Sequence, residues 1–214
     1  MLINAIRNGF SREAFVQLLL YIPIILISLT VHEYSHGYAA YKCGDMTARN
    51  FGRLTLNPLK HLDPIGTAMM LLFGFGYAKP VPINPRNFGK PRRDLCIVAA
   101  AGPVSNFVAF DLMRIQSIST FYGMWSIFAY SFVSANISLA VFNLIPLPPL
   151  DGSRLASVLL PTRIAYAIER YEQYIMFAVM LLLYFGKLDG IIFFFSNLIF
   201  GLFNSFLSLF PCFL

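Results

Sequence analysis

The chain has 214 residues, of which 57% are hydrophobic and only 12% charged, and its net charge is +6. This composition, with a mean hydropathy of +0.66, excludes an ordinary soluble domain and indicates a protein of the lipid bilayer. The basic residues are scattered over loops, so we expect them to set membrane topology, and we expect no nucleic acid as a partner.

A helix that spans the hydrocarbon core needs about 20 apolar residues. Five stretches are candidates: residues 14–42, 95–113, 122–145, 171–185 and 190–210. We therefore predict an all-α polytopic membrane protein with about five transmembrane helices, forming one membrane-embedded domain over residues 1–214. The last two stretches lie close together along the chain and leave open a tight hairpin or an amphipathic helix.

The first apolar stretch contains the pattern HEYSH, from His32 to His36, and carries no charge between residue 15 and His32. On a helix, two histidines four residues apart lie on one face and can bind one metal ion, with Glu33 beside them to take a proton from water. Ionisable residues inside a lipid-spanning segment are expensive unless they are paired or ligated. The pattern therefore predicts a zinc site with a catalytic base.

A sixth apolar stretch, residues 65–77, is too short to span comfortably and ends in a Gly-rich turn. We predict a re-entrant hairpin here, flanked by short β-strands at residues 48–57 and 79–87. The three prolines of residues 79–87 exclude a helix and confine that strand to an edge.

The distribution of the basic residues supports a hairpin at residues 65–77 that does not cross the bilayer. If residues 65–77 do not cross the bilayer, twelve of the sixteen basic residues fall on one side, and only Arg7, Arg12, Arg114 and Lys187 fall on the other. A crossing would reduce the split to ten against six. The positive-inside rule then predicts a multi-pass protein of the cell (inner) membrane, with the N-terminus outside and the active site toward the cytoplasm.

A zinc site built on two histidines needs a third protein ligand if one position is to remain for water. Residues 142–152, FNLIPLPPLDG, supply Asp151 where three prolines break an apolar helix and Gly152 permits a sharp turn. The alternative role for Asp151 is to cap a helix beginning near Ser153.

Three motifs together resemble the site-2 protease family, intramembrane metalloproteases of peptidase family M50. They are HEYSH, AAAGPVSN at residues 99–106, and FNLIPLPPLDG. Residues 57–67 and 76–88 look like the small bacterial branch of that family, which lacks PDZ or CBS domains. The motif core covers residues 31–152, and residues 153–214 supply further helices without a matching motif.

The resemblance implies one zinc ion per chain, bound by His32, His36 and Asp151, with Glu33 as the catalytic base. It also implies regulated cleavage of a transmembrane segment in a single-span partner protein. The oligomeric state is left open.

The tetrahedral oxyanion of peptide hydrolysis needs a hydrogen-bond donor. Asn106 is the first candidate, one helical turn after Gly102, where small residues allow close approach to the first span. Asn143 is the second candidate. The alternative for both is hydrogen bonding between helices, which polar residues in membrane helices commonly provide.

His61 is an alternative metal ligand, but with Asp63 we expect it to organise the loop that leads into residues 65–77. Cys43, Cys96 and Cys212 have no CxxC spacing, and we interpret them as small apolar residues, with metal ligation by Cys43 or Cys96 as the lesser alternative.

Two other functions compete with proteolysis. A zinc transporter would need acidic or His-rich pathways across several spans, whereas this chain has three histidines. A catalytically silent scaffold that binds membrane helices would have no need of Glu33.

Overall fold

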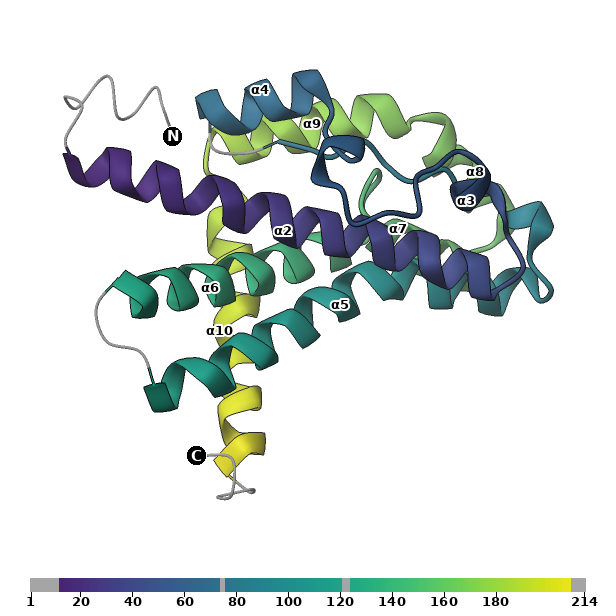
Figure 1. Cartoon of the computed structure of the whole chain (residues 1–214). Helices are drawn as coiled ribbons and strands as arrows, with labels where there is room; N and C mark the ends of the chain where they lie inside the picture. The colour runs from purple at the N-terminus through teal and green to yellow at the C-terminus, as the bar shows by residue number, and fades with distance from the viewer. Residues whose placement is uncertain (1–11, 74–75, 121–123, 209–214) are drawn as a thin grey trace. The chain divides into compact units, whose positions relative to one another are not determined.

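The computed structural model describes residues 12–73, 76–120 and 124–208 (Figure 1). Its contacts divide the chain into two compact units, Met1–Gly102 and Pro103–Leu214, and each unit is described by itself. Arg7, Cys212 and the start of the third predicted span at residues 122–123 lie outside the described residues. The single domain expected over the whole chain stays a prediction.

The first unit contains one long helix, several short ones and the start of another long helix. Its elements are α2 (Arg12–Lys42), α3 (Thr47–Asn50), the 3-10 helix η1 (Pro58–Lys60), α4 (Pro64–Phe73), the 3-10 helix η2 (Pro85–Asn87) and the first part of α5 (Pro91–Thr120). Helix α2 continues through Pro23. Within it, the hydroxyls of Ser28 and Ser35 donate to carbonyls four residues back, at 2.8 and 2.7 Å. These local bonds satisfy polar groups inside an apolar helix.

The connection between α2 and α5 folds back over the C-terminal half of α2 (Figure 1). Gly37 makes this close packing possible, because a Cβ there would lie 3.2 Å from Val81 Cγ1 and 3.4 Å from Leu54 Cδ1. The buried apolar cluster of Ala40, Phe88 and Val98 holds the end of the connection against α2 and α5. The segment around Val81 is therefore packed directly on the helix that carries the HEYSH pattern.

Carboxylates hold the ends of the short elements. Asp63 accepts hydrogen bonds from the amides of Ile65 and Gly66, at 3.0 and 2.9 Å, and so caps α4. Its expected part in organising this loop is confirmed.

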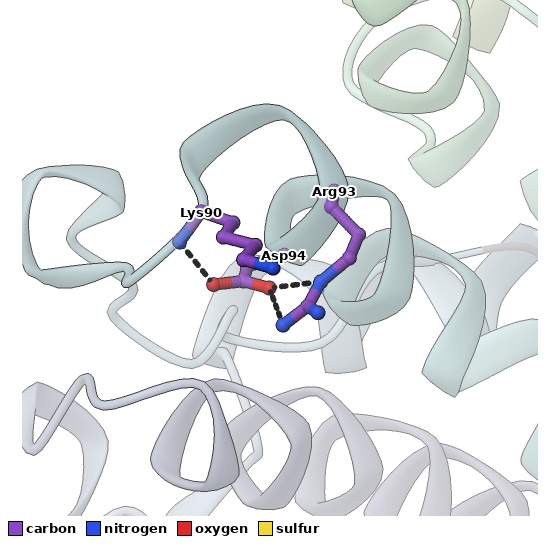
Figure 2. Close-up of polar contacts among 3 residues, drawn as sticks. All are labelled: Lys90, Arg93 and Asp94. Atoms are coloured by element: carbon purple, nitrogen blue, oxygen red, sulfur yellow. Dashed lines mark hydrogen bonds and ion pairs between the residues drawn. The ribbon is translucent and has the colours of Figure 1, made fainter.

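Asp94, in the first turn of α5, is buried and accepts from the Lys90 amide at 2.7 Å and from the Arg93 guanidinium at 2.9 and 2.8 Å (Figure 2). The Lys90 amide, followed by Arg93, lowers the pKa of Asp94 against the opposing effect of burial. This pairing fixes the point at which the chain enters α5.

Asp45 connects the end of α2 to η2. Its carboxylate accepts from the amide and hydroxyl of Thr47, from the Asn84 amide at 2.7 Å and from the Asn87 side chain at 2.8 Å. Burial raises the pKa of Asp45, but these hydrogen bonds together outweigh it, so the pKa lies below its ordinary value.

The two predicted strands do not form among the described residues. Residues 48–57 begin in α3 and continue through turns. The Thr47 amide donates a hydrogen bond to the Asp45 carboxylate at the start of α3, and the chain turns at Gly52, whose φ is +64°. Residues 79–84 lie in neither a helix nor a strand, and their prolines donate no ladder bonds, whereas residues 85–87 form the short 3-10 helix η2 where a strand without helix was predicted. Only an isolated antiparallel bridge, between Leu62 and Ala78, is present in this part of the described chain.

The predicted hairpin at residues 65–77 contains helix α4, followed by a return of the chain. A Cβ on Gly66 would overlap the Tyr77 carbonyl, so the backbone after α4 comes back to its first turn. Residues 74–75 lie outside the described residues.

The second unit is also helical. It contains the rest of α5, α6 (Met124–Leu144), α7 (Asp151–Leu159), α8 (Thr162–Arg170), α9 (Glu172–Tyr184) and α10 (Asp189–Ser208). Helices α6 and α10 pack together through Val133, Ile137, Val141 and Ile199. A Cβ on Gly152 would lie 2.5 Å from the Ile145 carbonyl oxygen, so the missing side chain allows α7 to begin directly against the end of α6.

Each of the five predicted spans coincides with a helix, namely α2, α5, α6, α9 and α10, so the all-α class is confirmed for the described residues. Among these residues, only α6 contains an apolar window long enough to cross a membrane by itself, at Ile127–Leu144. Helices α9 and α10 meet the same test as a pair, bent by 84°. The number of spans therefore remains a prediction.

Candidate metal centre

One turn of α2 brings His32 and His36 together inside the first unit. Their Nε2 atoms lie 3.1 Å apart, and their rings meet edge to face with centroids 4.7 Å apart. Both side chains are buried, at 4% and 5% exposure. The predicted spacing on one helix face therefore places two imidazole nitrogens at a common point.

The carbonyl of Val98 fixes the orientation of the His36 ring. It lies 2.7 Å from His36 Nδ1 and can only accept, so Nδ1 carries a proton, which in the metal-binding, neutral form of the ring fixes the tautomer. The lone pair of His36 then resides on Nε2 and faces His32. A backbone carbonyl is one of the common partners of a histidine that binds a metal, together with carboxylates and water.

Gly102 provides the space beside the two rings. A Cβ at this position would lie 2.6 Å from His32 Nε2 and closer still to His36 Nε2. The sequence predicted a close approach of these small residues to the first span, and the structure confirms it within the first unit. Only glycine can occupy this position without displacing the histidine pair.

The geometry of the pair fits zinc. Two nitrogens bound to a tetrahedral ion at about 2.0–2.1 Å lie about 3.3 Å apart. The observed 3.1 Å is close to this separation. Gly102, in α5, has no side chain and therefore leaves the space beside the two nitrogens open.

Glu33 is held by the loop that covers α2. Its Oε2 accepts a hydrogen bond from the Val81 amide at 3.0 Å, and its side chain is half-buried. One carboxylate oxygen is thus fixed by the backbone, which leaves Oε1 for proton transfer.

The remaining predicted site residues belong to the second unit. Asn106 is fully buried, and neither its amide nitrogen nor its amide oxygen has a hydrogen-bond partner among the described residues. Asn143 donates to the Leu139 carbonyl at 2.9 Å, within its own helix.

Asp151 is buried and is the first residue of α7, whose N-cap is Leu150. The helix expected near Ser153 therefore begins two residues earlier, and Asp151 does not occupy its N-cap position.

His61 is buried, and its Nε2 lies 2.8 Å from the Thr55 carbonyl, so this nitrogen is the donor and is not available to a metal. Cys43 and Cys96 are half-buried free thiols, and Cys43 packs against the apolar cluster around Ala40. Burial is the largest influence on Cys43 and raises its pKa, which disfavours the thiolate that binds metals.

Sequence reasoning did not foresee the contacts that Val98, Val81 and Arg53 make at or beside the site. The first two act through backbone groups, which every residue carries, so no sequence pattern could have identified them. Arg53 donates to two carbonyls near Val81, and only its burial, visible in the structure, distinguishes it from the other basic residues.

Comparison with known proteins gives the family. Residues 110–186 match peptidase family M50. The chain is 43% identical over 179 residues to "Putative zinc metalloprotease YwhC" of Bacillus subtilis (strain 168), an alignment that covers 78% of this chain and 80% of that protein. The chain therefore belongs to peptidase family M50: it is a peptidase, and its cofactor is zinc.

More distant relatives agree. "Putative zinc metalloprotease Rip2" of Mycolicibacterium smegmatis is 32% identical over 138 residues, which cover 59% of this chain and 52% of that protein. Rip2 of Mycobacterium tuberculosis (strain H37Rv) is 26% identical over 176 residues, covering 77% of this chain and 66% of that protein. No solved structure is significantly similar to the chain. The family and the apolar helix α6 together indicate association with a membrane.

Proposed function

We propose that this chain is a zinc-dependent intramembrane endopeptidase that cleaves transmembrane segments of single-span membrane proteins, as a step of regulated proteolysis. The observation that carries the proposal is the buried His32 and His36 pair on an apolar helix, with Nε2 atoms 3.1 Å apart and Glu33 beside it. Ionisable groups buried in an apolar helix are expensive, and shared ligation of a cation offsets this cost.

In this proposal His32, His36 and Asp151 bind one zinc ion per chain. Asp151 is supported by the sequence motif, by its place inside the matched residues 110–186 and by its burial at the start of α7. When bound, zinc makes water more acidic and polarises the scissile carbonyl.

Glu33 acts as the general base. With Oε2 held by the Val81 amide, Oε1 takes a proton from the attacking water as the new carbon–oxygen bond forms. Glu33 then gives this proton to the amide nitrogen as the carbon–nitrogen bond breaks. The carboxylate returns to its charged form, so protons balance over the cycle.

Asn106 donates to the developing oxyanion. Its fully buried amide has no partner among the described residues, and leaving such a group unpaired costs about 1–3 kcal/mol. A donor that gains its partner only as negative charge develops stabilises the transition state selectively. Asn143 remains the second candidate, although one of its amide hydrogens is given to Leu139.

The test is a comparison of wild type with Glu33→Gln, each co-expressed with a panel of single-span membrane proteins. We expect a shortened fragment with wild type and none with Glu33→Gln, while purified Glu33→Gln still holds about one zinc per chain. Glu172→Gln is the matched control, because it makes the same chemical change at an exposed position in α9. Cleavage that persists in Glu33→Gln would remove Glu33 as the base and reject the proposed mechanism.

The proposal includes an active site that faces the cytoplasm of a multi-pass inner-membrane protein. Single cysteines at Lys60, Arg92 and Lys187, in a cysteine-free background, report the side of each loop to an impermeant thiol reagent. We expect labelling from outside only at Lys187. Labelling at Arg92 without labelling at Lys60 would mean that residues 65–77 cross the bilayer.

A further inference from the structure

The backbone segment 79–81 is the structural partner of Glu33, and hydrogen bonds fix it on both sides. The Lys79 amide donates to the His61 carbonyl at 2.8 Å, whereas the Val81 amide donates to Glu33 Oε2 at 3.0 Å. The position of the carboxylate therefore depends on where this segment lies.

Arg53 binds the carbonyls of the same segment. Its Nη2 lies 2.6 Å from the Lys79 carbonyl oxygen and 3.3 Å from that of Pro80. These carbonyls directly precede the Val81 amide in the chain. Arg53 and Glu33 thus bind the same peptide group, between Pro80 and Val81, one as donor and one as acceptor, and Arg53 also binds the peptide group before it.

The burial of Arg53 is costly and needs an explanation. The side chain is only 9% exposed, and its Nε has no hydrogen-bond partner among the described residues. No carboxylate forms an ion pair with it in the part of the chain that the structure describes. A buried guanidinium without a counterion is stabilised only by directional bonds to neutral groups, here the two carbonyls of segment 79–81.

The packing of Val81 couples this segment to α2. Val81 is buried, and its Cγ1 would lie 3.2 Å from a Cβ on Gly37. Glu33 and Gly37 are four residues apart and share one face of α2. Val81 therefore contacts this face twice, through its amide at Glu33 and through its side chain at Gly37.

We propose that Arg53 is a positioning residue for catalysis, which binds the carbonyls of segment 79–81 so that the Val81 amide holds the Glu33 carboxylate in place. This inference rests on the proposed role of Glu33 as the base. Displacement of a catalytic group by about 1 Å can cost about 100-fold in rate. Arg53 should therefore act on the rate of the chemical step and leave zinc binding unaffected.

The experiment compares Arg53→Met, which keeps the length of the side chain and removes its donors, with Arg49→Met. Arg49 is exposed and contacts Tyr41, so the control removes the same charge without touching segment 79–81. The probe is a purified single-span protein found to be cut in a Glu33-dependent manner. The second readout, which needs no substrate, is hydrogen exchange of the amides in residues 78–84.

For Arg53→Met we expect kcat to fall about 10- to 100-fold with KM changed less than about threefold, and the Val81 amide to exchange at least about tenfold faster. Zinc should remain at about one per chain. Arg53→Lys should recover part of kcat, because an ammonium can donate to the same carbonyls. Arg49→Met should behave as wild type in all three measurements.

Two outcomes would overturn the proposal. Unchanged Val81 exchange in Arg53→Met would show that Arg53 does not hold the segment. A raised KM with normal kcat would assign the segment to substrate binding instead. If Arg53→Met does not fold, Gly37→Ala tests the same segment, since its Cβ would lie 3.2 Å from Val81 Cγ1 and push Val81 away by a few tenths of an ångström. It should lower kcat and speed Val81 exchange, both by less than Arg53→Met, and unchanged values of both would overturn the proposal.

The two sets of variants distinguish a failure of the positioning role from a failure of the proposed function. If Glu33→Gln cleaves normally, the proposed function fails, whatever the exchange data show. If Glu33→Gln is inactive and Arg53→Met has a normal kcat, only the positioning role fails.

Discussion

The two compact units of this peptidase use polar side chains in different ways. In the first unit, some side chains bind backbone groups that lie far away along the chain, besides local bonds such as those of Ser28 and Ser35. His36 contacts the carbonyl of Val98, 62 positions away, and Glu33 accepts from the amide of Val81, 48 positions away. Such bonds form only when the loops between the partners follow one path.

In the second unit, several polar side chains bind within their own helical turn. Asn136 and Asn143 donate to carbonyls four residues back, and Ser153 to a carbonyl three residues back. These bonds conceal polar atoms in apolar helices without fixing any distant segment. These described bonds therefore differ in reach: those of the first unit fix distant backbone segments, whereas those of the second unit stay within one helical turn.

The largest effect we expect comes from Gly102→Ala, which tests the first half of this comparison. The added Cβ would lie 2.6 Å from His32 Nε2 and nearer to His36 Nε2, so the pair must separate. Zinc affinity should fall at least about tenfold, and cleavage should be lost with it. Metal analysis of the purified protein measures this.

Gly190→Ala is the matched control, because no atom of the described residues lies within 4 Å of the Cβ it adds in α10. Zinc content and cleavage should remain as in wild type. Full zinc occupancy in Gly102→Ala would mean that the metal is not held between these two rings.

The next largest effect should come from Gly152→Ala, at the point of the second unit where the start of α7 leaves no room for a side chain beside the end of α6. A Cβ would lie 2.5 Å from the Ile145 carbonyl oxygen and closer still to that of Leu144, so α7 must shift. Because Asp151 begins α7, cleavage should fall about 10- to 100-fold. Initial rates measure this, with Gly190→Ala as control, since its Cβ meets no atom of the described residues within 4 Å. Equal rates for the two variants would show that the start of α7 is not held by this contact.

Asp45→Asn should have a moderate effect, on stability. The carboxylate accepts from Thr47, Asn84 and Asn87, and an amide nitrogen in its place would oppose those donors. Hydrogen bonds to charged groups contribute about 1.5–3 kcal/mol each, so we expect a loss of roughly 2 kcal/mol at pH 7, measured by thermal unfolding in detergent.

The stability lost in Asp45→Asn should depend on pH, and the lowered pKa of Asp45 gives the direction of that dependence. The pKa of Asp45 is lowered in the folded state, so its contribution is complete above the ordinary value of about 3.9 and is lost as pH falls through the lowered one. The difference between wild type and Asp45→Asn should therefore shrink as the pH is lowered from 5 toward 2. A difference that stays constant with pH would show that the charge of Asp45 is not what stabilises the loop.

The parts of this structure that sequence reasoning predicted are those with a local pattern. Apolar length predicted α2, α5, α6, α9 and α10, and the spacing of His32 and His36 predicted their shared face. Gly102 was recognised because small residues allow helices to approach. Each of these inferences needs only neighbouring residues in the sequence.

The parts that could not be predicted depend on the path of a loop. The two strands expected around Thr55 and Pro82 do not form, because side-chain bonds from Asp45 and Arg53 hold this loop where a backbone ladder was anticipated. In the same way, no pattern marks the Val81 amide as the partner of Glu33. These contacts join residues tens of positions apart, and their partners are backbone atoms common to all residues.

The smallest effect we expect comes from Ser196→Ala, which sharpens the second half of the comparison. The Ser196 hydroxyl is buried and has no hydrogen-bond partner among the described residues, and it borders a cavity of about 370 Å³ between α6 and α10. Removing a polar atom that makes no bond should change the free energy of unfolding by less than about 0.5 kcal/mol. Thermal unfolding of Ser196→Ala and Asp45→Asn under the same conditions compares the two losses of stability directly. A loss above about 1.5 kcal/mol would mean that the hydroxyl binds a group held in that cavity, and that the second unit also positions polar groups through specific partners.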